Sequence, residues 1–463
     1  MRRLATRQTI RTLAIFLAIA AACILLVRAL SRPSVRNDGI GYYAPLASIV
    51  FDGDLDLSNE VKHAHPFIRR SYFLKPDGTI VDPYAIGAAV LWAPVIYVSY
   101  LLDPDRAPRQ PGTWRNASKG FQARHVRALA LATGLEAVLA CAVLFFGMRR
   151  STGRLAAALG AGGAALGTPL VYYALADPSY AHTASFLACS ALLVAVLADR
   201  RKRLPLPLLG ALWGLASLVR WQDAVLGLLL APRLLEEVTR VRTSARRAIG
   251  GLLLFCAAAA IVFLPQILFW QRIYGRPLVM TVDRSFMQWG GPQILPFLFS
   301  TWHGAFIWSP LLLAGFVGVA FAPHRGLRWS LLGAMALEIY ICSAAGDWWG
   351  SGGFAARRLT AVAPIAAYGL AVLVARAASS SGRRRSLVAT AVALVALGAG
   401  WNVRLAQYNL AGLLPFNPAN VVEYHRHYPR GDPHRQRYAL WDHVRLGREV
   451  VEAERTMWKR RSR

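Results

Sequence analysis

Apolar runs near the length that crosses a lipid bilayer recur along this 463-residue chain. The first run lies at 12–30, and ten more lie at 126–148, 155–173, 180–198, 205–219, 222–232, 248–270, 304–322, 330–345, 359–376 and 386–403. A bilayer core takes about 20 residues of helix, so the pattern predicts an all-α polytopic membrane protein. Hydrophobic residues make up 55% of the chain and charged residues 17%, which excludes a disordered chain, a fibrous repeat or an ordinary soluble enzyme.

The positive charges between these runs predict the orientation of the chain in the membrane. One further run, 86–102, is ambiguous. If it does not cross, the short segments on the side of the N-terminus carry 22 Lys and Arg, and the short loops on the other side carry six. We therefore predict eleven spans with a cytoplasmic N-terminus in a bacterial inner membrane. A cleaved signal peptide is the alternative for 12–30, and either version exports the segment that follows.

A net charge of +29 raises the question of nucleic-acid binding. The arginines stand in short clusters between apolar runs, where membrane topology explains them better than a nucleic-acid surface does. We expect no nucleic-acid partner. All five cysteines fall inside apolar runs without metal-type spacing, which predicts core residues.

The runs 205–219 and 222–232 are short, and they predict a helical hairpin that turns at Arg220–Asp223. The long outward parts are a first loop at 32–125 and later loops at 271–303 and 346–358. We predict a membrane domain over 1–403, with interfacial helices in the first loop, and a tail at 404–463 that lies on the outer surface.

Acidic side chains gather in the first outer loop. Asp38 follows the first run closely, between small residues and the aromatic pair Tyr42-Tyr43, and it is placed to deprotonate a hydroxyl group. The cluster Asp52, Asp54, Asp56 and Glu60 has spacing like part of a calcium loop but lacks its remaining ligands, so a solvated acidic turn and a divalent metal site both stay open. We assign no metal ligand and leave a divalent metal possible.

Four segments resemble the GT-C glycosyltransferases, polytopic enzymes that use polyprenyl-phosphate sugars. Asp38 followed by Tyr after the first helix is similar to their start, and TIVDPYAIGAAVLWAPV (79–95) is similar to their Tyr-Pro-x-Gly segment, with Tyr84-Ala85 in place of Tyr-Pro. GALWGLASLVRWQDAVL (210–226) resembles their hairpin with a central Arg. DWWGSGGFAARRLTAVAPIAAYGLAVL (347–373) resembles their Trp-Phe-Gly-x-Arg segment, with Ala355 where glycine is common. The resemblance spans 12–403 and lies nearest bacterial dolichyl-phosphate-mannose-protein mannosyltransferases and aminoarabinose transferases.

This resemblance implies an inverting glycosyltransferase. It would move a hexose or pentose from a polyprenyl-phosphate carrier to a glycan, lipid or protein acceptor on the outer face of the membrane. Asp38 would be the general base. The expected substrate-binding residues are Tyr42, Tyr43, Lys75, Tyr84, His182, Arg220, Asp223, Arg357 and Arg358.

Other interpretations of these residues stay open. Headgroup anchoring explains Lys75 and the Arg357-Arg358 pair as well as phosphate binding does, and His182 is as consistent with a structural hydrogen bond. The alternative function is a transporter or flippase for a lipid-linked substrate, with Glu136, Glu338 and Arg220 along its path. A non-catalytic membrane assembly subunit is a third possibility.

Overall fold

The structure is a computed structural model, and it describes residues 33–64, 66, 69–105, 119–281, 284–300, 303–351, 353–380 and 384–410. In that part of the chain the regular structure is helical, and the β-type pairings are two isolated bridges, Leu74 with Ile80 and Met287 with Ala345. The predicted all-α fold class is therefore confirmed.

The α-helices are α2 (Asp38–Ala47), α4 (Gly87–Leu101), α6 (Ala123–Thr152), α7 (Arg154–Leu166), α8 (Leu170–Leu175), α9 (His182–Asp199), α10 (Leu206–Val219), α11 (Ala231–Tyr274), α12 (Ile294–Phe299), α13 (Ala305–Trp308), α14 (Pro310–Val319), α15 (Arg325–Ala344), α16 (Ala363–Ser379) and α17 (Arg384–Leu410). The 3-10 and π-type turns are η1 (Ser48–Asp52), η2 (Glu60–His63), η3 (Arg69–Phe73), η4 (Trp221–Leu230), η5 (Arg284–Phe286) and η6 (Arg357–Val362).

Within the described residues, six helices are long and apolar enough to cross a membrane. They are Ala123–Thr152, His182–Asp199, Ala245–Tyr274, Arg325–Ala344, Arg357–Ser379 and Arg385–Leu410. Shorter apolar helices lie at Gly87–Leu101, Arg154–Leu166, Leu206–Val219 and Pro310–Val319. The predicted run at 12–30 lies outside the described residues, so the total of eleven spans stays a prediction.

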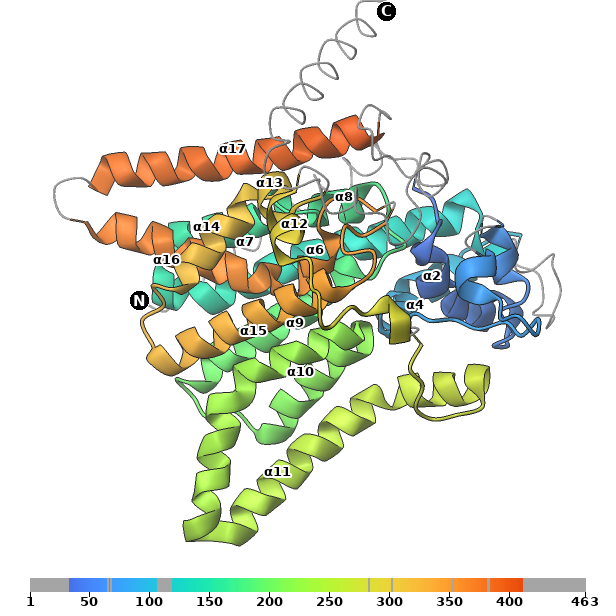
Figure 1. The fold of residues 1–463 in the computed structure, drawn as a ribbon, viewed down its shortest axis with the longest axis horizontal. Helices are drawn as coiled ribbons and strands as arrows, with labels where there is room; N and C mark the ends of the chain where they lie inside the picture. Colours follow the sequence, from blue (N-terminus) through green and yellow to red (C-terminus); the bar gives the residue numbers. More distant parts are fainter. Residues whose placement is uncertain are drawn as a thin grey trace, which may run out of the picture.

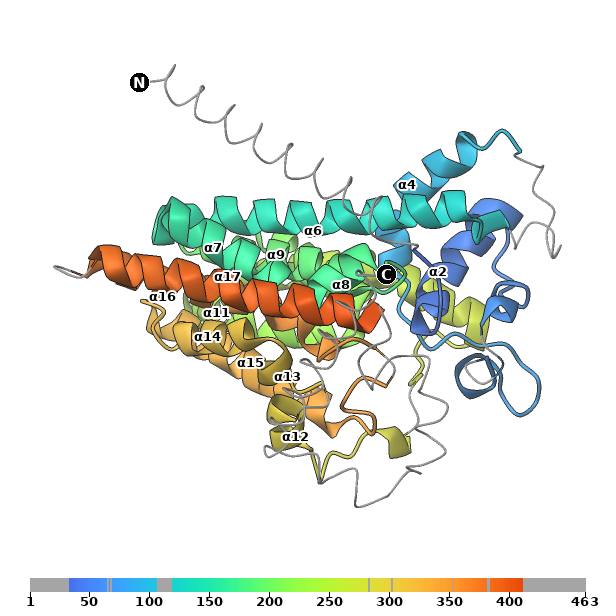
Figure 2. The same cartoon turned by 90° about the horizontal axis from the view of Figure 1, so that it is seen from above.

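Helices α6, α7, α16 and α17 lie side by side (Figures 1 and 2). Small residues allow some of these helices to approach closely. A Cβ on Gly318 would lie 2.1 Å from the carbonyl oxygen of Gly369, and one on Gly160 would lie 2.3 Å from that of Ala367. Glycine at such contacts brings two backbones together, which is how helices pack in a lipid solvent.

The turns predicted to be cytoplasmic share one end of the bundle. The α6–α7, α14–α15 and α16–α17 junctions lie at the left of Figure 2, and α2 and α4 lie at the right (Figure 2). The 86–102 segment forms α4, which lies obliquely beside α2 at that right-hand end and packs on α2 and α6. This arrangement agrees with a segment that does not run the length of the bundle.

Several predicted runs are broken where they approach the α2 end. The run 155–173 becomes α7 and α8, and the run 304–322 is interrupted at Ser309, whose φ and ψ are −137° and 72°. Asn402 on α17 satisfies this break by donating to the carbonyl oxygen of Trp308 at 2.5 Å. The predicted hairpin turn is also present, since Arg220 is extended between α10 and η4. Such breaks free backbone groups and aim side chains inward.

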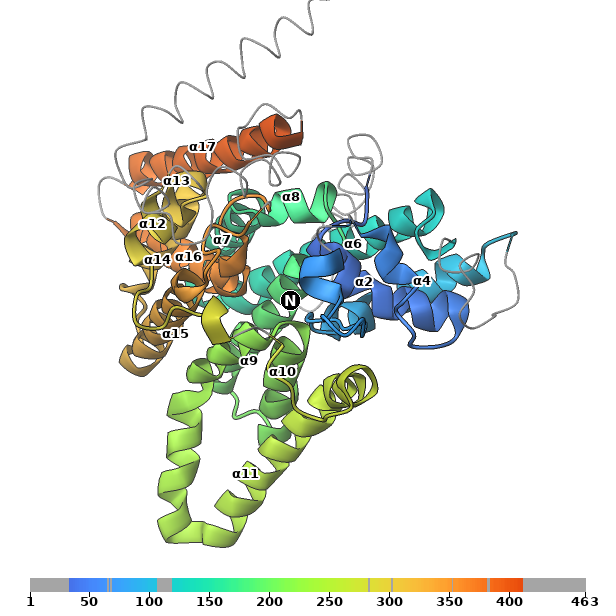
Figure 3. The ribbon, with the colours of Figure 1, turned by 45° about the vertical axis from the view of Figure 1, so that its right-hand side comes forward.

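Helix α11 has a bend that separates it into two limbs (Figures 1 and 3). The first limb holds most of the predicted cytoplasmic segment 233–247, and Arg233 lies 3.3 Å from Asp199 at the end of α9. The second limb packs against α10. Helix α17 continues past the predicted boundary at 403 to Leu410, and the rest of the predicted tail lies outside the described residues.

Candidate active site

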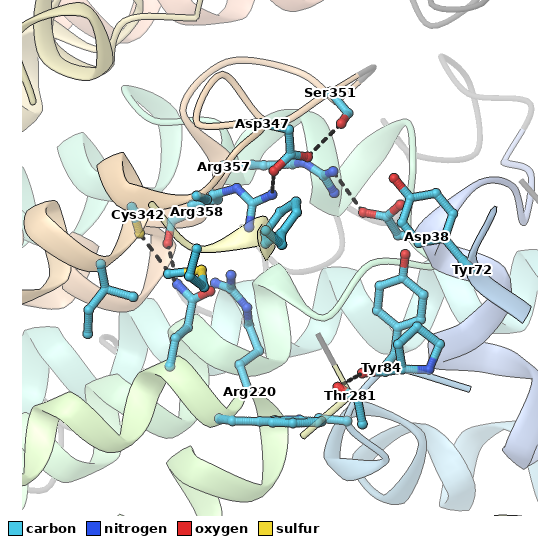
Figure 4. Close-up of a pocket in the computed structure, with 18 of the residues that line it drawn as sticks. Asp38, Tyr72, Tyr84, Arg220, Thr281, Cys342, Asp347, Ser351, Arg357 and Arg358 are labelled. Carbon is cyan, nitrogen blue, oxygen red and sulfur yellow. Dashed lines mark hydrogen bonds and ion pairs between the residues drawn. The ribbon is translucent and has the colours of Figure 1, made fainter. Parts of the chain in front are cut away.

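A cavity of about 490 Å³ opens near the start of α2 (Figure 4). Its wall is built from segments that are far apart in the sequence: the start of α2, the stretch before α4, the Arg220 break, the 281–287 loop, the end of α15 and the 347–358 loop. The lining includes seven of the ten predicted site residues, Asp38, Tyr42, Tyr84, His182, Arg220, Arg357 and Arg358.

Asp38 is the first residue of α2, and its carboxylate forms an ion pair with Arg357. The Asp38 Oδ2 atom lies 2.7 Å from Nη2 of Arg357, and the Tyr84 side chain also hydrogen-bonds the carboxylate (Figure 4). Burial is the largest single influence and raises the pKa of Asp38, but Arg357 and the Tyr84 hydrogen bond together lower it below its usual value. Asp38 is therefore ionised at neutral pH.

Contacts on several sides hold Arg357 in place. Its Nε and Nη2 atoms donate to the carbonyl oxygen of Gly350 at 3.2 and 3.0 Å, and its guanidinium lies 5.0 Å from the ring centre of Tyr180. A Cβ on Gly353 would lie 2.3 Å from the Arg357 Nε atom, so a larger residue at this position would displace the arginine side chain. Arg357 is 6% exposed, which makes it a fixed partner of Asp38.

The neighbouring Arg358 belongs to a second carboxylate pair. It bonds Asp347, whose other oxygen accepts a hydrogen bond from Ser351 at 2.6 Å (Figure 4). The Arg358 guanidinium also lies 5.9 Å from the ring centre of Phe286. Its Nε atom is buried with no hydrogen-bond partner among the described residues, so Arg358 retains a donor for a ligand.

Arg220 stands at the break between α10 and η4. Its Nη1 atom donates to the hydroxyl of Thr360 at 3.1 Å, and it lies 4.0 Å from the carboxylate of Asp223. This ion pair is looser than the Asp38–Arg357 pair. Gln222, in the same turn, donates to Glu338 at 2.6 Å and to the carbonyl oxygen of Arg358 at 2.9 Å. The hairpin thus fixes both Arg220 and the backbone of the arginine pair.

Tyr84 is positioned by α11 and the loop that follows it. Two hydrogen bonds hold the backbone just before Tyr84. The Tyr274 hydroxyl donates to the carbonyl oxygen of Asp82, and the Thr281 hydroxyl donates to that of Pro83, both at 3.0 Å. The Tyr84 ring packs against Tyr42 with ring centres 4.8 Å apart. The 79–95 segment therefore places Tyr84 beside Asp38.

Three predicted site residues lie outside the cavity wall. Tyr43 is buried in the core, where its hydroxyl donates to the carbonyl oxygen of Gly120 at 2.8 Å. Asp223 is also buried, behind Arg220, and accepts a hydrogen bond from Ser185 at 2.6 Å. Lys75 is exposed on a turn, with its ammonium 5.3 Å from the ring centre of Tyr274. None of the three faces the cavity, because each is held by its own local partners.

Local hydrogen bonds reach two carboxylates of the acidic turn in the first loop. Asp54 accepts hydrogen bonds from Ser48 at 2.8 Å and from the backbone of Asp56 at 3.1 Å, while Asp52 accepts one from Asn59 at 2.6 Å. Across the described residues, no group of three or more His, Cys, Asp or Glu side chains could hold a metal ion.

Sequence reasoning missed several cavity residues. Asp347 and Ser351 lie in the 347–373 segment, but the sequence does not show that Asp347 pairs with an arginine of the same segment. Gln222 lies beside Arg220 in the hairpin motif. Tyr72 lines the cavity from η3 and carries no sequence signal that separates it from other loop tyrosines.

Fold and site together define a class of protein. It is a helical membrane bundle in which broken helices and loops enclose a charged cavity at one end. No family model and no curated protein matches the chain. Among solved structures, ArnT from Cupriavidus metallidurans bound to undecaprenyl phosphate is similar, with a TM-score of 0.50 and 16% identity over 95% of this chain and 77% of that one. The archaeal oligosaccharyltransferase AglB from Archaeoglobus fulgidus, in complex with an inhibitory peptide and a dolichol-phosphate, has a TM-score of 0.47 and 15% identity over 90% of this chain and 60% of that one.

The similarity to ArnT shows the fold of this chain. This fold agrees with the one that the sequence resemblance implied.

Proposed function

We propose that this protein is a glycosyltransferase that moves a sugar from a polyprenyl-phosphate carrier to an acceptor at the outer face of a bacterial inner membrane. One observation carries the proposal: an ionised carboxylate, Asp38, and three arginines meet in a single cavity of a GT-C-folded bundle. A base and a cluster of cations are what transfer from a sugar phosphate to a hydroxyl acceptor requires.

Asp38 acts as the general base in this proposal. The acceptor hydroxyl attacks the anomeric carbon, the new carbon–oxygen bond forms, and the bond to the phosphate oxygen breaks, which inverts the anomeric centre. The proton of the hydroxyl passes to Asp38, and the polyprenyl phosphate leaves with the bonding electrons. Arg357 and Tyr84 keep Asp38 ionised and fix the orientation of its carboxylate.

The donor phosphate is assigned to Arg220 and Arg358. Arg357 is engaged by Asp38 and the carbonyl oxygen of Gly350, so its main effect falls on the base. Arg358 retains an unpartnered Nε atom, and Arg220 has only a distant carboxylate partner. Guanidinium groups form charge-assisted hydrogen bonds with phosphate oxygens, and these strengthen as negative charge develops on the leaving group.

The carrier lipid would reach the cavity along its apolar side. Trp221, Phe286, Met287 and Ile341 line this part of the wall. Trp221 continues toward the second limb of α11, where its ring meets that of Trp270 with centres 5.0 Å apart. An apolar wall beside a cationic one suits a ligand with a hydrocarbon tail and a phosphate head.

The experiment is direct. Purified full-length protein is incubated with radiolabelled polyprenyl-phosphate sugars and a membrane extract as the acceptor source, and label transfer is measured. We expect transfer with wild type and none with Asp38→Asn. Equal transfer by both proteins would overturn the assignment of the base, and no transfer with any donor would overturn the glycosyltransferase proposal.

A further inference from the structure

His182 is a buried side chain in the cavity wall, at the first position of α9. It is 3% exposed, and its ring is packed against Tyr173 and Tyr180, with ring centres 4.3 and 5.8 Å away. Two aromatic neighbours leave the imidazole little freedom to turn. The orientation of its two nitrogens is therefore set by their hydrogen-bond partners.

The hydroxyl of Thr360 fixes which nitrogen carries the proton. This hydroxyl donates its single hydrogen to the carbonyl oxygen of Arg357 at 3.0 Å, because a carbonyl can only accept. Its oxygen accepts from Nη1 of Arg220 at 3.1 Å and lies 3.0 Å from Nδ1 of His182. With its hydrogen already used, Thr360 can only accept from His182, so Nδ1 carries the proton.

The other nitrogen of the ring is left as an acceptor. In a neutral imidazole with the proton on Nδ1, Nε2 holds a free lone pair. The His182 Nε2 atom is buried and has no hydrogen-bond partner among the described residues. Buried polar atoms in proteins are nearly always paired, and an orphaned one in a ligand-sized cavity indicates that the ligand supplies the partner.

We propose that Nε2 of His182 accepts a hydrogen bond from a hydroxyl group of the transferred sugar and selects neutral hydroxylated sugars over amino sugars. This inference rests on the proposed glycosyltransferase function and identifies the sugar class. The shared hydroxyl of Thr360 ties His182 to Arg220, the arginine assigned to the donor phosphate. The imidazole therefore lies where a sugar attached to that phosphate would be.

The charges of the cavity favour a hydroxyl over an ammonium group as the partner. The carboxylates in the cavity lining are Asp38 and Asp347, and each already pairs with an arginine. Arg220 adds a further positive charge beside His182. A cationic amino sugar would meet guanidinium groups without a free carboxylate, whereas a hydroxyl needs only the lone pair of Nε2.

Two substitutions separate recognition from structure. The side-chain amide of His182→Asn reaches the position of Nδ1, so it keeps a donor for Thr360 and removes the group at Nε2. The longer His182→Gln places its amide near the position of Nε2. His303→Ala serves as the histidine control, because His303 bonds the carbonyl oxygen of Trp349 at 2.8 Å and does not line the cavity.

Binding is measured on the full-length protein with farnesyl phosphate, farnesyl-phosphate hexoses, their single-deoxy analogues and a farnesyl-phosphate amino sugar. We expect wild type to bind a hexose donor about fivefold to tenfold more tightly than farnesyl phosphate, the scale of one hydrogen bond. His182→Asn should lose this gain and keep its affinity for farnesyl phosphate, and His182→Gln should recover part of it. One deoxy analogue should weaken binding to wild type and not to His182→Asn, while the amino sugar should bind no more tightly than farnesyl phosphate.

Hexose binding by His182→Asn at the wild-type level, or preference of wild type for the amino sugar, would overturn the role of His182 and leave the proposed function intact. Failure of wild type to bind farnesyl phosphate in any form would overturn both proposals. Loss of the gain in His303→Ala would show that the effect is not specific to the cavity and would also overturn the assignment.

Discussion

The acidic turn at residues 52–60 and Asp38 lie in the same first loop, but their carboxylates have opposite surroundings. The three aspartates of the turn accept hydrogen bonds from nearby residues, as Asp56 does from the backbone of Ser58 at 3.0 Å. Asp38 instead meets Tyr84 and Arg357, which come from distant parts of the chain. A high density of acidic residues along the sequence therefore does not indicate the candidate site. Charged residues from distant parts of the chain that meet in one cavity do indicate it.

The two regions also differ in what surrounds their carboxylates. In the cavity, Asp38 and Asp347 each form an ion pair with a guanidinium group. In the turn, Glu60 is fully buried beside Asp52, and burial raises the pKa of Glu60 to about 9. The ion pair in the cavity thus favours the charged form of Asp38, while burial in the turn favours the neutral form of Glu60.

The largest expected effect concerns the side of the membrane on which both regions lie. Cysteines at Asp56 and Ser351, in a background without native cysteines, should react with an impermeant thiol reagent in intact spheroplasts. A cysteine at Arg201 should not react, because the distribution of Lys and Arg places it in the cytoplasm. Labelling at Arg201 together with protection at Ser351 would invert the predicted topology.

Substitution of Asp38 should lower turnover far more than substitution of an aspartate in the acidic turn. Asp38→Asn keeps the shape of the side chain and removes its basicity, so turnover should fall by about two decades or more. Asp54→Asn, the matched change in the acidic turn, should stay within about a factor of two. Because Arg357 lowers the pKa of Asp38, the wild-type rate should not fall on the acid side until the pH drops below the usual range of a carboxyl. Turnover of Asp38→Asn above half the wild-type value would contradict this role.

Removal of a phosphate-binding arginine should have a smaller effect, mainly on the donor. Arg220→Ala or Arg358→Ala removes a charge-assisted contact of about 1.5–3 kcal/mol, so the donor KM should rise by about one to two decades. Lys75→Ala is the matched control, since Lys75 is exposed outside the cavity. An unchanged donor KM in both arginine variants would contradict phosphate binding, and for Arg358 it would support headgroup anchoring, the alternative that the sequence left open.

The sequence predicted the fold and most of the charged groups of the site, because both leave local signals. Apolar runs of membrane length mark helices, and an arginine such as Arg220 inside an apolar hairpin is conspicuous. The sequence could not predict which arginine pairs with which carboxylate. Nothing local shows that Arg357 meets Asp38 while Arg358 meets Asp347, because one residue along η6 turns a side chain to a different neighbour.

The direction of each side chain could not be predicted from the sequence for the same reason. Tyr43 follows Tyr42 directly, yet on a helix adjacent side chains face different directions, so Tyr42 lines the cavity and Tyr43 enters the core. The intramembrane acids also needed the structure. Glu136 accepts hydrogen bonds from Trp92 at 3.3 Å and Thr183 at 2.8 Å, partners that come from two other helices.

The smallest effect is expected from the acidic turn, and it concerns stability. The pKa of Glu60 is raised to about 9 by burial, with a further contribution from Asp52, whereas an unfolded glutamate titrates near 4.5. Between these two values the folded protein holds a proton that the unfolded chain has lost, so stability is fully present at low pH and falls as the pH rises through this window. Glu60→Gln cannot ionise and should avoid that loss. We expect its apparent unfolding temperature to match wild type near pH 4.5 and to exceed it by a few degrees at pH 9, while turnover at neutral pH stays within about a factor of two of wild type. A variant that is less stable than wild type at pH 9 would show that Glu60 is charged in the folded protein, and the contrast with the cavity would then fail.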